Sequence, residues 1–324
     1  MPRALITGIT GQDGSYLTEL LLENGYEVHG VVRQGQALER TRLKHLVEAV
    51  GKKLFLHEAT LEDSAALKRV ITQVAPDELY HLASMTHVGL SFEQPEQTCD
   101  MTGMGTLRLL EIVKAMPKPP RFFHASSSEI FGKPETVPQD ENTPFRPVTP
   151  YGCAKAFATN MVSVYRQTHG LFACNGILFN HESPRRGENF VTQKICRAAA
   201  AIKLGKQNEL VLGTITSFRD WGHAHDYVRG MWLMLQQEKA ADYVLATGEL
   251  HTVQEVLELA FETAGLDYRK FLKQDPRFMR PVEPSQLVGN PAKAKRELGW
   301  QPTVSFKELI VEMTNAALKE MSSV

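Results

Sequence analysis

The stretch that decides the fold is ALITGITGQDG, residues 4–14. Its short apolar run predicts a buried parallel strand, and the residues after it have the apolar spacing of a helix that ends near Gly25. Glycines between the two allow a tight turn and a close approach of a pyrophosphate to the helix N-terminus. They lie three residues apart, unlike the common Gly-x-Gly-x-x-Gly spacing. The stretch predicts the opening of a dinucleotide-binding unit.

The end of the next predicted strand, residues 27–32, indicates which dinucleotide binds. An acidic residue at this point binds the ribose 2′-hydroxyl of NAD, whereas an arginine accommodates the 2′-phosphate of NADP. The chain has Arg33 there and no acid beside it in the sequence, which favours NADP. The alternative is that Arg33 is only a solvated surface cation.

Strands and helices alternate through the first 180 residues. Strands are predicted at 54–56, 78–83, 121–125 and 173–179, and helices at 38–50, 64–74 and 99–115. This order is typical of a Rossmann-type α/β fold, a doubly wound parallel sheet. We expect residues 1–180 to form mainly the NADP-binding domain. Residues 181–324 would form mainly a smaller, mixed α/β substrate-binding lobe that interleaves with the sheet.

The segments expected in the second half are shorter. Strand-like runs occupy 210–212 and 243–246, and helices are predicted at 226–237, at 253–264 and after Ser305.

A possible reactive centre follows the predicted strand at 121–125. Ser127 and Glu129 come directly after this strand, and ligands of open parallel sheets bind at the carboxyl ends of strands. Tyr151 and Lys155 are four residues apart, which places them on one face of a helix. An ammonium near a phenol favours the phenolate, so Tyr151 would serve as a base. Taken alone this spacing is common and is more often a coincidence.

Composition excludes several functional classes. The 324 residues have a net charge of -1, which gives no overall attraction to nucleic acid or to an anionic membrane. No apolar run reaches transmembrane length and no signal peptide is recognisable, so a reducing cytoplasm is expected. The four cysteines are scattered along the chain, which argues against a disulfide framework and against a structural zinc site. His223 and His225 lack a third ligand at suitable spacing, so no metal site is predicted.

Cations recur in the second half of the chain, where a substrate diphosphate would need bidentate arginines. They are Arg185, Arg186, Lys194, Arg219, Arg277 and Arg280. For Arg185 and Arg186 a solvated surface position is an equally good interpretation.

Several longer motifs carry a family resemblance. They are ITGITGQDGSYL at 6–17, SFEQP at 91–95, NHESPRRGENFV at 180–191, RDWGHA at 219–224, DPRFMRP at 275–281 and AKAKRELGW at 292–300. With the Ser127, Glu129, Tyr151 and Lys155 set, the chain resembles the extended short-chain dehydrogenase/reductase superfamily. Within that superfamily it is similar to the GDP-mannose 4,6-dehydratases over nearly its whole length.

The resemblance implies a role for each matching position. Ser127, Glu129, Tyr151 and Lys155 would be catalytic. The implied NADP contacts are Gly8, Thr10, Gly11, Gln12, Asp13, Gly14, Arg33, Leu61, Leu82, Ala83, Ser84, Tyr151 and Lys155. The implied GDP-sugar contacts are Ser84, Ser127, Glu129, Asn180, Asn189, Val191, Lys194, Arg219, Arg280 and Glu283.

The implied reaction is an internal redox cycle. Tyr151 would deprotonate the sugar 4-hydroxyl as hydride leaves C4, Ser127 would polarise O4, and Lys155 would hold the nicotinamide ribose. Glu129 would take the C5 proton and help expel the 6-hydroxyl. Alternatives are a GDP-heptose 4,6-dehydratase, a nucleotide-sugar epimerase or reductase on the same fold, and a catalytically silent NADP-binding regulator.

The chain also departs from the family pattern. Gln34-Gly35-Gln36 replaces a second arginine and a serine-rich stretch, in a loop that touches a neighbouring subunit and its cofactor in relatives. The resemblance implies a homodimer or a homotetramer. This change in the loop argues against the tetramer and leaves the dimer plausible. Thr60 replaces an aspartate that holds adenine, and Met85 replaces a common glutamine.

Overall fold

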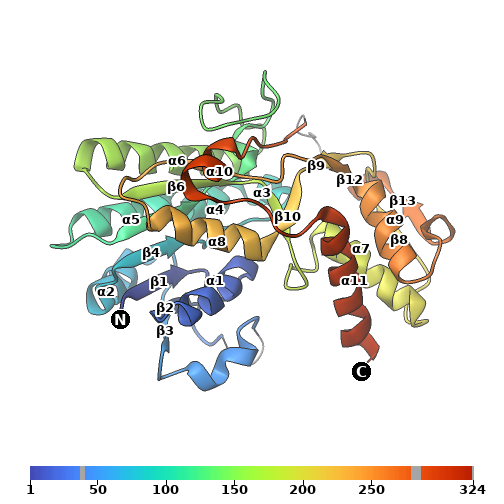
Figure 1. The fold of residues 1–324 in the computed structure, drawn as a ribbon, viewed down its shortest axis with the longest axis horizontal. Helices are drawn as coiled ribbons and strands as arrows, with labels where there is room; N and C mark the ends of the chain where they lie inside the picture. Colours follow the sequence, from blue (N-terminus) through green and yellow to red (C-terminus); the bar gives the residue numbers. More distant parts are fainter. Residues whose placement is uncertain (37–40, 279–285, 323–324) are drawn as a thin grey trace.

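A parallel sheet lies at the centre of the computed structural model, which describes residues 1–36, 41–278 and 286–322 (Figure 1). Over these residues the sheet has seven strands in the order β11-β6-β5-β4-β1-β2-β3. Their bounds are β1 Arg3–Thr7, β2 Glu27–Val32, β3 Leu54–Glu58, β4 Glu78–His81, β5 Arg121–Ala125, β6 Ala173–Leu178 and β11 Tyr243–Leu245. The doubly wound Rossmann-type sheet predicted from the sequence is confirmed.

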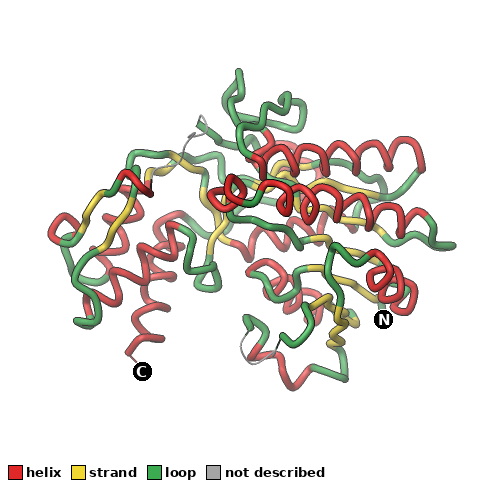
Figure 2. The backbone as a smooth tube through the Cα atoms, turned by 180° about the vertical axis from the view of Figure 1, so that it is seen from behind, coloured by secondary structure: helices red, strands yellow, loops and turns green. Residues whose placement is uncertain are grey.

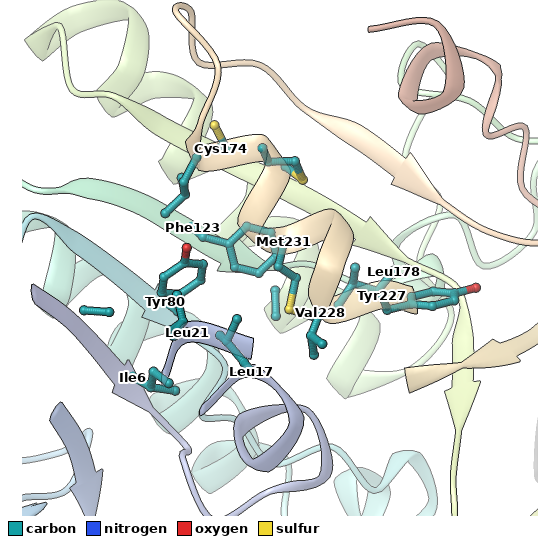
Figure 3. Close-up of a cluster of buried hydrophobic side chains, with 14 of the residues drawn as sticks. Ile6, Leu17, Leu21, Tyr80, Phe123, Cys174, Leu178, Tyr227, Val228 and Met231 are labelled. Atoms are coloured by element: carbon teal, nitrogen blue, oxygen red, sulfur yellow. The ribbon is translucent and has the colours of Figure 1, made fainter. Parts of the chain in front are cut away.

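Helices cover both faces of the sheet because its strands are apolar on both sides. In β1, Ala4 and Ile6 face one layer and Leu5 faces the other. The first layer contains α1 (Gln12–Glu23) and α8 (Ala224–Leu235), whose side chains meet Tyr80 and Phe123 of the sheet (Figure 3). The second layer contains α2 (Ser64–Val74), α5 (Gly105–Lys114) and α6 (Pro150–His169).

A smaller lobe lies beside the carboxyl ends of the strands and is also visible from behind (Figure 2). Its core is built by helices α7 (Val191–Lys203), α9 (Val253–Thr263) and α11 (Phe306–Ser322). Short strand pairs complete it: β7 (Asn180–Glu182) with β10 (Trp221–His223), β9 (Phe218–Arg219) with β12 (His251–Thr252), and β8 (Leu210–Leu212) with β13 (Leu272–Gln274). The chain returns from this lobe to the sheet through α8, β11 and α10 (Ala292–Leu298).

Three predicted elements differ from the observed ones. The helix expected at 38–50 is only a 3-10 helix, η2 (Lys44–Ala49), without a buried residue, and Leu38 lies outside the described residues. Leu43, Leu46 and Ala49 pack on the core, whereas Val47 and Val50 are exposed, so the predicted apolar face is only partly buried. The helix expected at 99–115 begins earlier, with α4 (Pro95–Cys99) and a π-helical turn, η3 (Asp100–Met104). Strand β4 ends at His81 rather than Ala83.

A row of buried polar side chains crosses the second face of the sheet. Thr7, His81, His124 and Asn175 are register partners on β1, β4, β5 and β6, so their side chains point the same way. Thr7 Oγ1 lies 2.8 Å from His81 Nδ1, and His124 Nδ1 lies 2.9 Å from Asn175 Oδ1. Burial lowers the pKa of His81 well below its usual value and that of His124 to about 3.

These buried imidazoles predict acid sensitivity. Below pH 6.5 the unfolded chain binds protons that the folded chain does not bind. The stability is therefore present above the unfolded pKa and is lost as the pH falls toward about 3. In that window the neutral His124 contributes a loss that approaches about 1.4 kcal/mol per pH unit. His124→Gln should weaken the fall in urea midpoint between pH 6.5 and 5, with His225→Gln as an exposed control. Parallel curves for His124→Gln and the unmodified protein would contradict this expectation.

Candidate active site

One cavity of about 810 Å³ opens beside the carboxyl ends of β4, β5 and β6. Ser127, Glu129, Tyr151 and Lys155 all line it, as do Asp13 and Leu82 from the predicted dinucleotide site. The parallel sheet explains this meeting, because the loops that follow neighbouring strands share one edge. The predicted reactive centre and the predicted cofactor turn therefore border one space.

The glycine turn between β1 and α1 is closely packed. Gly8 has φ +78, and a Cβ there would lie 2.8 Å from Ala83 N. A Cβ on Gly14 would lie 2.4 Å from Gly8 O, so a side chain is excluded at both positions. Glycine at these two positions therefore lets the turn pack its backbone directly against residue 83 and against the start of α1.

The other predicted cofactor residues follow the neighbouring strands. Arg33 follows β2, Leu61 lies after β3, and residues 82–84 follow β4. Arg33 is exposed, while Leu61 is buried against Gly105. The structure adds an acid that adjacent sequence could not reveal, because Glu58 Oε1 accepts a hydrogen bond of 3.2 Å from Gly35 N. Glu58 is the register partner of Val32, so it reaches the loop across the sheet.

Ser127 and Glu129 reach the cavity from a turn and not from an extended chain. If residues 127–129 were extended, the two side chains would point to the same side of the chain. Ser127 is extended, but residues 128–130 form a 3-10 helix, η4 (Ser128–Ile130). Ser127 Oγ caps it by accepting a hydrogen bond of 3.3 Å from Glu129 N, which favours the turn over an extended chain. Both side chains nevertheless line the cavity.

Tyr151 and Lys155 lie in the first turns of α6. Thr149 caps this helix by accepting a hydrogen bond of 2.9 Å from Gly152 N, and Pro150 occupies its first position. Lys155 Nζ donates a hydrogen bond of 2.7 Å to Ala125 O of β5 and lies 5.9 Å from the centroid of the Tyr151 ring. The spacing-based prediction that the two side chains share a face is confirmed.

Burial dominates the protonation of this pair. It raises the pKa of Tyr151, although a hydrogen bond with Ser127 acts in the opposite direction. It lowers the pKa of Lys155 to about 7. The lowering of the Tyr151 pKa that the spacing predicted is therefore outweighed in the unliganded cavity, because both groups lose solvation. Lys155 is close to half protonated near neutral pH.

An ion pair that the sequence analysis did not assign connects the glycine turn to the lobe. Asp13 Oδ2 lies 2.9 Å from His181 Nε2, and the pair lowers the pKa of Asp13 and raises that of His181. Burial is the strongest single influence on each pKa and opposes both shifts, but the charge and hydrogen-bond contacts together outweigh it. Gln12 also donates to His181 O at 3.1 Å. No local spacing signals this contact, since its partners are 168 residues apart.

The structure separates the two adjacent arginines of the predicted clamp. Arg186 lines the cavity, forms an ion pair with Glu182 at 3.0 Å and lies over the ring of Phe190. Arg185 turns to α1, where it pairs with Glu19 at 2.7 Å and lies over the ring of Tyr16. Of these two arginines, only Arg186 lines the cavity.

Most predicted substrate contacts meet on the lobe side of the cavity. The described ones that line it are Asn180, Asn189, Val191, Lys194 and Arg219, with Arg277 beside them. Ser84 is not among the described residues that line the cavity. Its hydroxyl oxygen forms a hydrogen bond of 3.0 Å with the hydroxyl oxygen of Thr102. Arg280 and Glu283 lie outside the described residues.

Other parts of the described chain offer no comparable site. Its residues include no group of three or more His, Cys, Asp or Glu side chains able to hold a metal ion. His223 instead contacts Glu312 at 3.2 Å, and His225 is exposed. Among the residues described, no helix combines the length and apolar character needed to cross a membrane.

Comparison with solved structures places the fold. The structure of DesIV from Streptomyces venezuelae, a dTDP-glucose 4,6-dehydratase with NAD and TYD bound, superposes on this chain with a TM-score of 0.87. The two sequences are 24% identical. The match covers 99% of this chain and 98% of that one. RMD from Pseudomonas aeruginosa, complexed with NADPH, is also 24% identical, with a TM-score of 0.82 and coverages of 99% and 100%. At this identity the similarity establishes the fold alone.

Sequence comparison is more specific. GDP-mannose 4,6 dehydratase 2 of Arabidopsis thaliana is 50% identical over 324 residues, which cover 98% of this chain and 87% of the relative. The GDP-mannose 4,6-dehydratase of Yersinia enterocolitica is 44% identical, with coverages of 99% and 95%. The family profile described as GDP-mannose 4,6 dehydratase matches residues 5–313. With the cavity set described above, these matches show that the chain belongs to the GDP-mannose 4,6-dehydratase family.

Proposed function

We propose that this protein converts GDP-D-mannose to GDP-4-keto-6-deoxy-D-mannose with NADP as its cofactor. The observation that carries the proposal is the joint presence of Ser127, Glu129, Tyr151 and Lys155 in one cavity. An oxidation at C4 and an elimination across C5 and C6 need separate acid/base groups. Tyr151 and Glu129 supply them, and family membership identifies the sugar nucleotide.

The residues of the site fit a nicotinamide dinucleotide. The tight glycine turn brings the N-terminus of α1 to the carboxyl end of β1, where a pyrophosphate would bind, and Lys155 is placed to hold a ribose. When bound, such a cofactor takes a hydride from the sugar and returns it to the same sugar. The nicotinamide end would lie where Leu82 and Tyr151 border the cavity.

The protein's own groups would handle the protons. Tyr151 would remove the proton of the 4-hydroxyl while Ser127 donates a hydrogen bond to O4. The resulting 4-keto group acidifies the neighbouring C5–H bond. Glu129 would then take the C5 proton and pass a proton to the departing 6-hydroxyl, which leaves as water. On the lobe side, Lys194 and Arg219 would neutralise the diphosphate.

Product analysis distinguishes this reaction from its alternatives. Incubation with GDP-mannose and a catalytic amount of NADP should give a product lighter by one water in mass spectrometry. A reductase would consume stoichiometric NADPH, and an epimerase would leave the mass unchanged. A silent NADP-binding regulator would give no product. Faster turnover of a GDP-manno-heptose would favour the GDP-heptose 4,6-dehydratase.

Two further properties belong to this proposal. A homodimer or homotetramer is supported by Met104 of η3 and Phe157 and Val164 of α6, large apolar side chains left exposed on one chain. A reducing cytoplasmic location is supported by the four cysteines, all of which are free thiols.

The NADP preference is tested at the end of β2. Arg33 is exposed and can pair with the 2′-phosphate, while the Glu58 carboxylate is engaged by Gly35 N. Arg33→Ala should weaken NADP binding by about 1.5–3 kcal/mol and leave NAD binding nearly unchanged, measured by calorimetry. Lys52→Ala, at another exposed cation, is the control. Equal affinities of the unmodified protein for the two cofactors would refute the preference.

The role of Tyr151 is tested by removing its hydroxyl. Tyr151→Phe should keep the fold and lower turnover by about a hundred- to ten-thousandfold, the usual contribution of a general base. Tyr165→Phe is a matched control on the same helix, because Tyr165 bonds to Glu111 away from the cavity. Near-normal turnover by Tyr151→Phe would show that the Tyr/Lys spacing is a coincidence.

The elimination step is tested separately at Glu129. Glu129→Gln should still reduce some NADP in the presence of GDP-mannose, because Tyr151 and Ser127 remain, but should form no 4-keto-6-deoxy product. For the unmodified protein in deuterated water, the product should carry deuterium at C5, and the hydride at C6 should come from C4 of the same sugar. Unimpaired dehydration by Glu129→Gln would remove this residue from its role.

A further inference from the structure

We propose that His124 is a positioning residue for Lys155: one buried water accepts a hydrogen bond from the Lys155 ammonium and donates one to the Nε2 lone pair of His124. The inference rests on the proposed function only in its consequence for turnover. His124 is fully buried in β5, immediately before Ala125, whose carbonyl oxygen already accepts a hydrogen bond from Lys155. It does not line the cavity, so it would act only through the lysine.

The hydrogen-bond partners define the tautomer of His124. Asn175 Nδ2 donates to Thr159 O at 3.1 Å, and a carbonyl oxygen can only accept. Asn175 therefore presents its Oδ1 to His124 Nδ1, at 2.9 Å, and Nδ1 must carry the proton. With a pKa of about 3 the ring is neutral at physiological pH, so Nε2 is a bare acceptor.

This acceptor has no hydrogen-bond partner within the described residues, although it is buried. Buried polar atoms in proteins are nearly always paired with protein or with ordered water. A donor is therefore expected beside His124 Nε2, and it must come from a group with an N–H or O–H to spare.

A water held by Lys155 is such a group. The ammonium has three N–H donors, and the hydrogen bond to Ala125 O uses one of them. Asn175, which accepts the hydrogen bond from His124, is itself held by Thr159 O of α6, one helical turn after Lys155. The charge of Lys155 acts on the His124 ring and, with burial, lowers the pKa of that histidine.

His81 provides an internal comparison because its two nitrogens are already used. Thr106 Oγ1 donates to Thr102 O, so it accepts from His81 Nε2 at 3.0 Å. The neutral His81 ring then accepts from Thr7 Oγ1 at Nδ1, 2.8 Å away. His81 thus has no free lone pair to offer to Lys155, although its ring lies 5.8 Å from that of His124.

This water-mediated bond would keep more of Lys155 in its charged form. A neutral acceptor stabilises an ammonium relative to an amine, whereas burial acts in the opposite direction and lowers the pKa of Lys155 to about 7. The other ionisable groups around the pair are His81 on β4, Tyr151 on α6 and Glu129 on η4. Asn175 on β6 and Thr106 on α5 carry no charge.

The test compares two substitutions at position 124. His124→Leu removes the acceptor, and His124→Gln restores one through its amide oxygen. The titration of Lys155 is followed by NMR of lysine labelled at 13Cε, with its signal assigned by its absence in Lys155→Met. We expect the midpoint to move about one pH unit lower in His124→Leu, a tenfold loss of affinity for the proton. His124→Gln should recover at least half of this shift, and His81→Gln should leave the midpoint in place.

Activity gives a second readout. The high-pH limb of kcat should shift to lower pH in His124→Leu by the same amount, with recovery in His124→Gln. Should His124→Leu fail to fold, His124→Met removes the acceptor with a more adaptable side chain. Equal Lys155 midpoints in all variants, or an equal shift in His81→Gln, would overturn the inference. Absence of dehydration by the unmodified protein would instead overturn the proposed function, and the NMR titration would still decide the role of His124.

Discussion

The parallel arrangement of the strands is the constraint on which the rest of the structure depends. Every strand of the large sheet ends at the same edge, so the loops after β1, β4 and β5 are neighbours although they are far apart in the sequence. The glycine turn, Leu82 and the Ser127–Glu129 segment meet there. Helices cover both faces of the sheet, and the cavity opens at this edge, with the smaller lobe beside it (Figure 1).

Burial has opposite consequences for the reactive groups of this edge. It stabilises the neutral forms of Tyr151 and Lys155, whereas the proposed reaction would need a phenolate and an ammonium. Hydrogen bonds to the charged forms are the means by which a protein offsets this effect. The bond between Lys155 and Ala125 O, and that from Ser127 to Tyr151, are of this kind. The polar row behind the cavity places a further acceptor on the same side of the sheet.

The lobe is tied to the sheet by polar contacts as well as by its own core. The Asp13–His181 ion pair joins the first turn of α1 to β7, which leads into the cavity loop at residues 183–190. In that loop Arg186 lines the cavity, whereas Arg185 pairs with Glu19 of α1. The Asp13–His181 ion pair therefore fixes the Asp13 carboxylate, beside the glycine turn, relative to Arg186 and the rest of the cavity loop.

Local patterns in the sequence determined the sheet, the glycine turn and the Tyr151–Lys155 face, because strand burial, glycine geometry and helix period act between near neighbours. Only the tertiary structure decided that residues 44–49 form a 3-10 helix in place of the predicted α-helix, because Leu43 and Leu46 pack on the core while Val47 does not. It also decided the η4 turn, where a single Ser127 cap redirects the chain, and the approach of Glu58 to Gly35. Contacts such as Asp13 with His181 join residues whose separation carries no periodic signal, and they exist only once the lobe has packed beside the sheet.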